Sequence, residues 1–245
     1  MTEWTAPPRP APLPTRQQVH LWRLRLPAES EPAWRDILTA EEREHAHRFH
    51  FQADRRRFTV TRAVLRTILA EYLDTEACSL RFLINEYGKP SLAPEHNPAG
   101  ISFSVSHSGD CSLLAFGGSV EVGVDVEDLR KGRDVMGLGK AVLAPSEYRE
   151  FLGLPGGERR LFLFQRWTRR EAVAKALGRG LSAPLDQLEA AAKSDDWSVR
   201  SIDIGEDYAA ALAVRSPNIE LRTWDRIAAG GTVSSSARSK PAAGG

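Results

Sequence analysis

The sequence has few cysteines, no long apolar segment and no surplus of charge. Its two cysteines, Cys78 and Cys111, stand far apart and in no metal-ligand spacing, which argues against a disulfide framework or a cysteine zinc site. No apolar run is long enough to span a membrane, and residues 1–16 lack the apolar core of a secretory signal. We therefore expect a cytoplasmic protein with free thiols.

The charge balance narrows the possible partners. There are 33 basic and 32 acidic side chains, and the formal net charge is +1. A general nucleic-acid binder usually has a basic surplus, so we expect no nucleic-acid partner. A local basic pocket for a small polyanion remains compatible with this balance.

Two catalytic motifs are also missing. The chain contains neither a Gly-x-Ser-x-Gly elbow nor a Gly-x-x-x-x-Gly-Lys loop. These absences argue against a serine hydrolase of the elbow type and against a P-loop nucleotide enzyme.

The ends of the chain differ in composition from its middle. Residues 5–14 include five prolines, and residues 228–245 are mostly small or polar, so we expect a disordered head over 1–16 and a disordered tail over 228–245. Between them, each half reads as a strand, a helix and three strands. This order predicts an α+β fold with two similar subdomains, 17–118 and 119–227. Periodicity and turn residues predict helices at 40–50, 54–72 and 158–177 and strands at 19–26, 80–84, 101–105, 112–116, 120–126, 197–204, 208–214 and 219–224.

The first chemical motif lies in the strand predicted at 120–126 and just beyond it. Side chains alternate along a strand, so Asp125 and Glu127 share one face while Val124 and Val126 point into the core. Two carboxylates on one face repel each other unless a cation lies between them, and magnesium prefers such oxygen ligands. The alternative is a solvent-facing edge strand with two ordinary acidic residues.

The second motif is a charged pair on the helix predicted at 158–177. Glu171 and Lys175 are four residues apart and lie on one side of the helix. An exposed ion pair would explain them. Their apolar neighbours, however, predict a largely buried helix, where charged groups need a partner such as a metal or a phosphate.

The third motif is Ser104-Val-Ser-His-Ser-Gly109, which follows Gly88-Lys89-Pro90 in the chain. Hydroxyl, imidazole and ammonium groups are good donors to phosphate. The alternative for His107 is a structural role with satisfied hydrogen bonds.

Two further clusters are poor candidates for a site. Of His45, His47 and His50, only the last two lie close together on a helix, so we do not expect a metal there. The run 55–57 consists of three arginines, but consecutive helix residues point in different directions. At most one or two of them can serve a single ligand.

Together these motifs resemble the 4′-phosphopantetheinyl transferases of the larger, surfactin-synthetase-activating type. The resemblance rests on four segments in order, which are Tyr87-Gly-Lys-Pro90, Phe103 to Gly109, Gly123 to Glu127, and Phe164 to Leu181 with Trp167, Glu171, Lys175 and Gly178. It spans about residues 39–225. It departs from the family pattern at Glu42 and His45, where basic residues are expected, and Arg43 or Arg48 are the candidates to replace them.

The resemblance implies a magnesium-dependent enzyme in which coenzyme A lies between the two subdomains. It would transfer the 4′-phosphopantetheine group to a serine of an apo acyl or peptidyl carrier protein and release adenosine 3′,5′-bisphosphate. Because the larger type is a single chain, we expect a monomer. By family pattern Asp125, Glu127 and Glu171 hold the metal, Lys175 and His107 contact phosphates, and Lys89, Ser106 and Arg57 are candidates for the nucleotide. Glu171 is the best candidate for the base.

Two other functions remain open at this stage. A magnesium-dependent phosphohydrolase would use Asp125 and Glu127 and release inorganic phosphate without a carrier. A carrier-binding module would bind the carrier without modifying it, although the acidic and basic residues of the pattern are retained.

Overall fold

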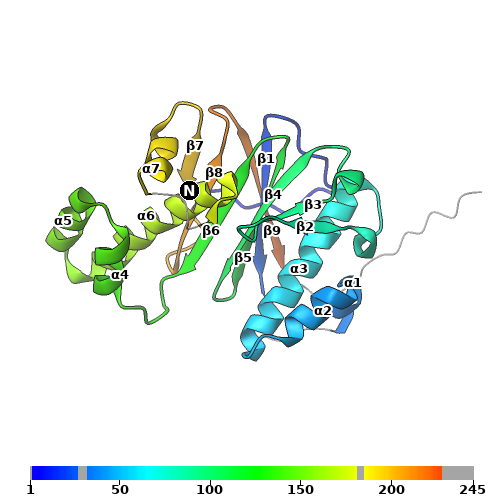
Figure 1. Cartoon of the computed structure of the whole chain (residues 1–245), viewed down its shortest axis with the longest axis horizontal. Helices are drawn as coiled ribbons and strands as arrows, with labels where there is room; N and C mark the ends of the chain where they lie inside the picture. Colours follow the sequence, from blue (N-terminus) through cyan, green and yellow to red (C-terminus); the bar gives the residue numbers. More distant parts are fainter. Residues whose placement is uncertain (1, 27–31, 181–184, 228–245) are drawn as a thin grey trace, which may run out of the picture.

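The computed structural model describes residues 2–26, 32–180 and 185–227. Figure 1 shows its helices and strands in chain order. None of the helices in these ranges has the length and apolar character needed to cross a bilayer. The elements are β1 (Gln18–Arg25), α1 (Pro32–Ile37), α2 (Ala40–His47), α3 (Gln52–Leu73), η1 (Ala77–Ser79), β2 (Phe82–Ile84), β3 (Pro90–Leu92), η2 (Pro94–His96), β4 (Ile101–Ser108), β5 (Cys111–Gly118), β6 (Val122–Asp128), α4 (Val135–Val142), α5 (Pro145–Gly153), α6 (Gly156–Leu177), α7 (Leu185–Lys193), β7 (Ser198–Ser201), β8 (Tyr208–Val214) and β9 (Glu220–Ile227).

The two halves of the chain repeat one topology. In the first half the strand order is β4-β5-β1, and in the second it is β7-β8-β6. In both, the last strand of the unit lies between the other two and is antiparallel to each. Each unit also has one helix of 22 residues, α3 or α6. The chain therefore has the expected α+β fold of two similar units.

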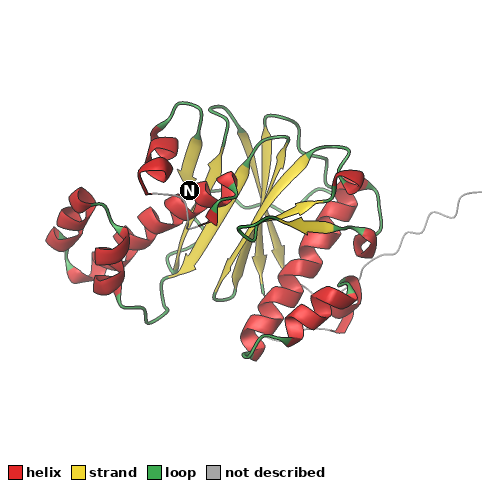
Figure 2. Cartoon of the chain, viewed as in Figure 1, coloured by secondary structure: helices red, strands yellow, loops and turns green. Residues whose placement is uncertain are grey.

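Two sheets form the centre of the molecule, and the long helices cover their outer faces (Figure 2). Successive side chains of a strand point to opposite faces of its sheet, so one face of each sheet packs against a long helix and the other against the second sheet. On β5, Leu114 and Phe116 pack in the core that includes α3, whereas Leu113 and Ala115 pack in the core that includes β6 and β8. On β8, Leu212 faces that second core while neighbouring alanines face α6.

Strand β9 differs from the expected division of the chain at 118/119. It pairs in parallel with β1, with Trp224 opposite Trp22, and so joins the sheet of the first half. The rings of these two tryptophans lie 4.8 Å apart in an edge-to-face arrangement. The two paired segments lie about 200 residues apart in the chain. Tertiary contacts decide this pairing, and local sequence does not show them.

The head of the chain also differs from the expectation of disorder. Thr5 exchanges main-chain hydrogen bonds with β9, from its N–H to Thr223 at 3.3 Å and from Asp225 to its carbonyl at 2.8 Å. Trp4 lies under the guanidinium of Arg23, and Ala11 is buried in the first core. The free edge of β9 provides backbone partners that composition does not show. The expected tail, 228–245, lies outside the described residues.

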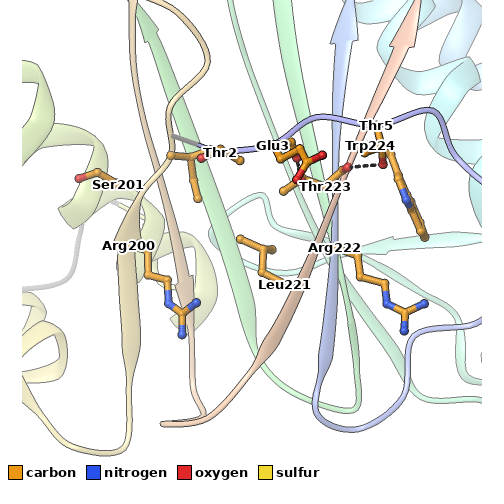
Figure 3. Close-up of a pocket in the computed structure, with 10 residues that line it drawn as sticks. Thr2, Glu3, Thr5, Arg200, Ser201, Leu221, Arg222, Thr223 and Trp224 are labelled. Carbon is orange, nitrogen blue, oxygen red and sulfur yellow. Dashed lines mark hydrogen bonds between the residues drawn. The ribbon is translucent and has the colours of Figure 1, made fainter.

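A shallow pocket of about 580 Å³ lies where this head crosses between β7 and β9 (Figure 3). Arg200 and Arg222 are among its lining residues. It contains none of the residues that the sequence marks as candidates for chemistry.

Candidate active site

Gly123 brings α6 into close contact with β6. A Cβ atom at this position would lie 1.9 Å from the carbonyl oxygen of Ala172 and 2.4 Å from the main-chain nitrogen of Ala176. No side chain fits in that space, so only glycine allows the helix to cross the strand here. The crossing places the helix motif against the face of β6 that bears the two carboxylates.

The two motifs meet in a polar triad of Asp125, Lys175 and Ser106. The ammonium of Lys175 lies 2.7 Å from Oδ1 of Asp125 and 2.9 Å from Oγ of Ser106. The Ser106 hydroxyl donates to the same Oδ1 at 2.8 Å. The triad therefore joins α6, β6 and β4, which belong to both halves of the chain.

Alternate serines of β4 hold β6 beside it. Each serine hydroxyl accepts a hydrogen bond from a main-chain N–H of β6, where a neighbouring strand would normally supply a carbonyl. The pairs, with donor first, are Val124 to Ser104 at 3.1 Å, Val126 to Ser106 at 3.3 Å and Asp128 to Ser108 at 3.1 Å. The sequence motif Ser-x-Ser-x-Ser thus sets the position of β6 relative to β4, and with it the position of the carboxylates.

Basic side chains surround Glu127 at the far end of β6. Its carboxylate accepts from Ser108 at 3.0 Å and from Arg133 at 3.1 Å. Lys131 donates to the same Ser108 hydroxyl at 2.9 Å. Lys131 and Arg133 lie outside the motifs from which the site was predicted. The available signal was the basic run that directly follows the acidic strand.

Glu171 lies in the field of the other two carboxylates. Burial, followed by the negative charges of Asp125 and Glu127, raises its pKa to about 7, and the positive charge of Lys175 opposes this rise. Neighbouring negative charges of this kind make a divalent cation favourable.

Oδ2 of Asp125 supports the same interpretation. It is buried, and no group among the described residues hydrogen-bonds to it. Three carboxylates with one orphaned oxygen are a donor set that suits magnesium. Within the described ranges, however, no group of three or more acidic, histidine or cysteine side chains is already gathered at metal-binding distances.

His107 lies on β4 and belongs to the part of the site that the first half of the chain provides. Desolvation by surrounding protein atoms lowers its pKa to about 4, although the residue keeps an exposed edge, and the charge of Arg57 is the next cause, with a smaller contribution from Lys175. Arg57 itself donates to the carbonyl of Gly109 at 3.1 Å. The imidazole is therefore a neutral hydrogen-bonding group with positive charges beside it, and its ring N–H can donate to an anion.

Lys89 has structural contacts. Its ammonium donates to the main-chain carbonyls of Ala176 at 3.0 Å and Val122 at 3.4 Å. Asn85 of the same hairpin donates to the carbonyl of Gly178 at 2.8 Å. The hairpin is thus fixed to the end of α6, and among the described residues Lys89 contacts no other candidate site residue.

Structural contacts explain why position 42, in α2, holds a glutamate where the family pattern has a basic residue. Glu42 completes a capping box with Thr39 and accepts from the buried guanidinium of Arg66 at 2.7 and 3.0 Å. Arg43 donates to the carbonyl of Leu38 at the end of α1. Arg43 is therefore held at the end of α1, and the expectation that it or Arg48 replaces the missing basic residues stays a prediction.

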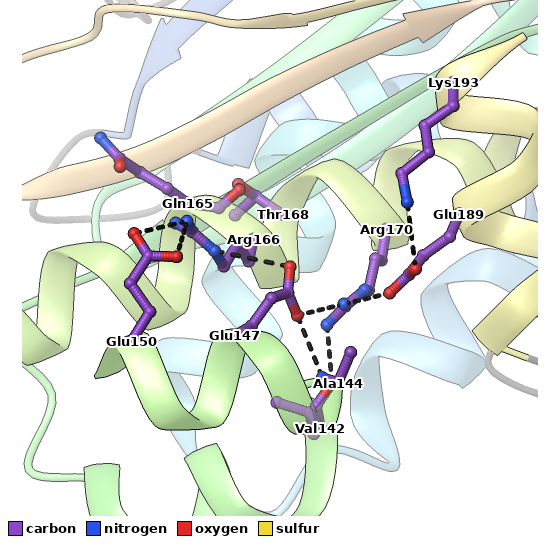
Figure 4. Close-up of polar contacts among 10 residues, drawn as sticks. All are labelled: Val142, Ala144, Glu147, Glu150, Gln165, Arg166, Thr168, Arg170, Glu189 and Lys193. Carbon is purple, nitrogen blue, oxygen red and sulfur yellow. Dashed lines mark hydrogen bonds and ion pairs between the residues drawn. The ribbon is translucent and has the colours of Figure 1, made fainter. Parts of the chain in front are cut away.

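Arg170 anchors the helix that carries Glu171 and Lys175 (Figure 4). It donates to the carbonyl of Val142 at 2.6 Å, to Glu189 at 2.7 Å and to Glu147. The single side chain therefore ties α6 to the end of α4, to α5 and to α7. The sequence alone places an arginine here but does not identify these partners.

Comparison with known proteins gives matches over both halves. Residues 27–118 match the family model described as 4′-phosphopantetheinyl transferase, N-terminal, and residues 121–219 match that of the 4′-phosphopantetheinyl transferase superfamily. The 4′-phosphopantetheinyl transferase HetI of Nostoc sp. is 33% identical over 219 residues, which cover 84% of this chain and 92% of the relative. A 4′-phosphopantetheinyl transferase of Bacillus subtilis is 26% identical over 82% of this chain and 95% of the relative. The transferase Sfp of Bacillus subtilis is 28% identical over 66% and 70%.

Proposed function

The chain belongs to the 4′-phosphopantetheinyl transferase superfamily, and we propose from the site above how it moves the 4′-phosphopantetheine group of coenzyme A onto a carrier protein. The observation that supports the proposal most is the contact between Lys175 and Asp125, because it brings the acidic strand and the basic helix to one point.

We assign the metal to Asp125, Glu127 and Glu171. The orphaned Oδ2 of Asp125 and the raised pKa of Glu171 are what an arrangement adapted to a cation should show. When bound, magnesium would neutralise charge on the pyrophosphate of coenzyme A and on the leaving group. Sharing one cation would relieve the mutual repulsion of the three carboxylates.

The basic residues would bind the donor. Lys175 would lie beside the pyrophosphate, where its charge stabilises the transition state. Neutral His107 would donate a hydrogen bond to a phosphate oxygen, and Arg57, which lies close enough to lower the pKa of His107, would add a second positive charge. Ser106 would orient Lys175, since its hydroxyl accepts from that ammonium. Lys89 would support the site by fixing the hairpin rather than by direct contact.

The proposed transfer proceeds by attack of a carrier serine. Its oxygen forms a bond to the phosphorus that bears the pantetheine arm, and the bond from that phosphorus to the bridging oxygen breaks. Adenosine 3′,5′-bisphosphate leaves with the electron pair. Glu171 would take the serine proton as general base, in addition to its proposed role as a metal ligand.

One chain supplies all of these groups, so we propose that a monomer is sufficient. Asp125 and Glu127 come from β6, Glu171 and Lys175 from α6, and His107 from β4.

Intact mass spectrometry tests the function. The protein is incubated with an apo carrier protein, coenzyme A and magnesium, and the carrier is weighed. The proposal predicts a gain of one phosphopantetheine group that a chelator abolishes. An unchanged carrier mass together with release of inorganic phosphate would instead favour a phosphohydrolase.

A further inference from the structure

A second cavity lies between α1, α2 and the first turns of α3, and it contains none of the candidate active-site residues. Its volume is about 660 Å³, which is within the range of small-molecule sites, roughly 300–1,000 Å³. Four arginines line it, and its described lining residues include no aspartate or glutamate. The arginines are Arg35, Arg43, Arg55 and Arg56.

Three of these arginines have partners other than carboxylates. Arg43 donates to the carbonyl of Leu38 at 2.5 Å, Arg55 donates to that of Phe49 at 3.3 Å, and Arg35 lies 3.2 Å from Nε2 of His47. None of the three forms a salt bridge with a carboxylate of the described residues. Arg56 lies 3.2 Å from Asp110. The cluster therefore carries more positive charge than the described acidic groups around it balance.

One donor of the cluster is buried and unused. Nε of Arg55 is shielded from solvent, and no described group accepts a hydrogen bond from it. Arg55 lies in the first turn of α3, whose N-cap residue, Phe51, provides no side-chain acceptor. The helix end adds potential of the same sign as the guanidinium groups. An anion in the cavity would meet both an unused donor and an unbalanced positive field.

We propose that this cavity binds a small free anion that carries phosphate. Planar guanidinium groups donate paired hydrogen bonds to phosphate oxygens, and arginine is the side chain best suited to this recognition. The described lining has no phenylalanine, tyrosine or tryptophan on which a base would stack, and its arginines are suited to phosphate, so we take the phosphate as the recognised group. The bound anion would link α1, α2 and α3 through their arginines.

Calorimetric titration with inorganic pyrophosphate tests the proposal. The titrations are made on the full chain at constant ionic strength and with a chelator, so that no divalent cation assists binding at the active site. Arg55→Gln is expected to weaken binding at least about tenfold, and the exposed Arg35→Gln is expected to weaken it by a smaller factor. The matched charge removal Arg149→Gln on α5 and the active-site change Lys175→Gln are expected to leave it within about twofold of the unmodified chain.

Ligand-free melting temperatures show whether Arg55→Gln folds, and Arg35→Gln provides the test if it does not. Absence of binding at millimolar pyrophosphate would overturn the proposal. So would equal binding by all variants, or a loss that follows Lys175 instead of Arg55 and Arg35. Arginine-dependent binding to phosphatidic acid vesicles without binding of pyrophosphate would show that a lipid surface, and not a free anion, is the ligand.

Discussion

The ammonium of Lys175 lies 2.7 Å from Oδ1 of Asp125, although the two residues are 50 positions apart. The Asp125 side chain is 7% exposed and that of Lys175 is 28% exposed. Two opposite charges that are buried to this extent attract each other strongly. Removal of either one would leave the other charge buried without its partner. Lys175 therefore maintains the charge balance of the site as well as facing the proposed ligand.

Lys175→Met is expected to lower kcat about a hundredfold, because it removes a positive charge where negative charge develops. Steady-state rates of carrier modification measure this. Lys140→Met, on α4, removes an exposed lysine as a control and should retain the rate. A similar loss in both variants would show that Lys175 has no specific role.

Glu171→Gln separates binding from chemistry. The amide keeps the size of the side chain but cannot take a proton, so transfer should fall at least about a hundredfold while coenzyme A binding persists. Calorimetry and intact-mass rates make the two measurements. If transfer remains at the original rate, Glu171 is not the base.

Gly123→Ala tests the crossing of α6 over β6. The new methyl group would meet main-chain atoms of Ala172 and Ala176, which cannot move without shifting the helix. We expect the free energy of unfolding to fall by about 2 kcal/mol and the transfer rate to fall with it.

Gly157→Ala is the matched control for this change. A Cβ at Gly157, in the first turn of α6, meets no atom within 4 Å, so this substitution should be neutral or slightly stabilising. Denaturant unfolding of both variants gives the comparison. Equal stability of the two would contradict the close contact at Gly123.

His20 should make the protein sensitive to acid. Burial, with a contribution from Arg222, lowers its pKa to about 4 from 6.5. Its Nδ1 lies 2.8 Å from the hydroxyl of Tyr72, which accepts from Trp22 and so donates to the neutral ring. Between pH 6.5 and 4 the unfolded chain binds a proton that the folded chain does not.

This contribution to stability is therefore complete above pH 6.5 and is lost as the pH falls toward 4. The expected slope is about 1.4 kcal/mol per pH unit. Urea unfolding at several pH values gives the dependence of the unfolding free energy on pH. Between pH 4 and pH 6.5 this dependence should be weaker for His20→Gln, by the equivalent of up to one bound proton. Identical slopes would mean that His20 does not titrate in this way.

Local sequence was sufficient where local physics decides the structure. Alternation along β6 correctly placed Asp125 on the face opposite Val124, and Thr39 with Glu42 forms the expected capping box. Gly178 ends α6 in the left-handed conformation that the sequence predicts. These features depend on neighbours within a few residues.

Features that depend on distant contacts were missed or misassigned. The helices α1, α4, α5 and α7 have between six and nine residues, too short for a clear period. The pairing of β9 with β1 and the packing of Trp4 are decided by tertiary partners. For the same reason local sequence does not show that Lys89, which we expected to bind the nucleotide, donates to main-chain carbonyls of β6 and α6.

Titration with manganese, a spectroscopic substitute for magnesium, tests the central claim that one cation is shared by side chains from β6 and α6. Electron paramagnetic resonance in the presence of coenzyme A counts the bound ions. We predict one ion per chain for the unmodified protein and for the exposed control Asp195→Asn, and at least about tenfold weaker binding for Asp125→Asn. Binding of manganese by Asp125→Asn with the affinity of the unmodified protein would contradict the claim.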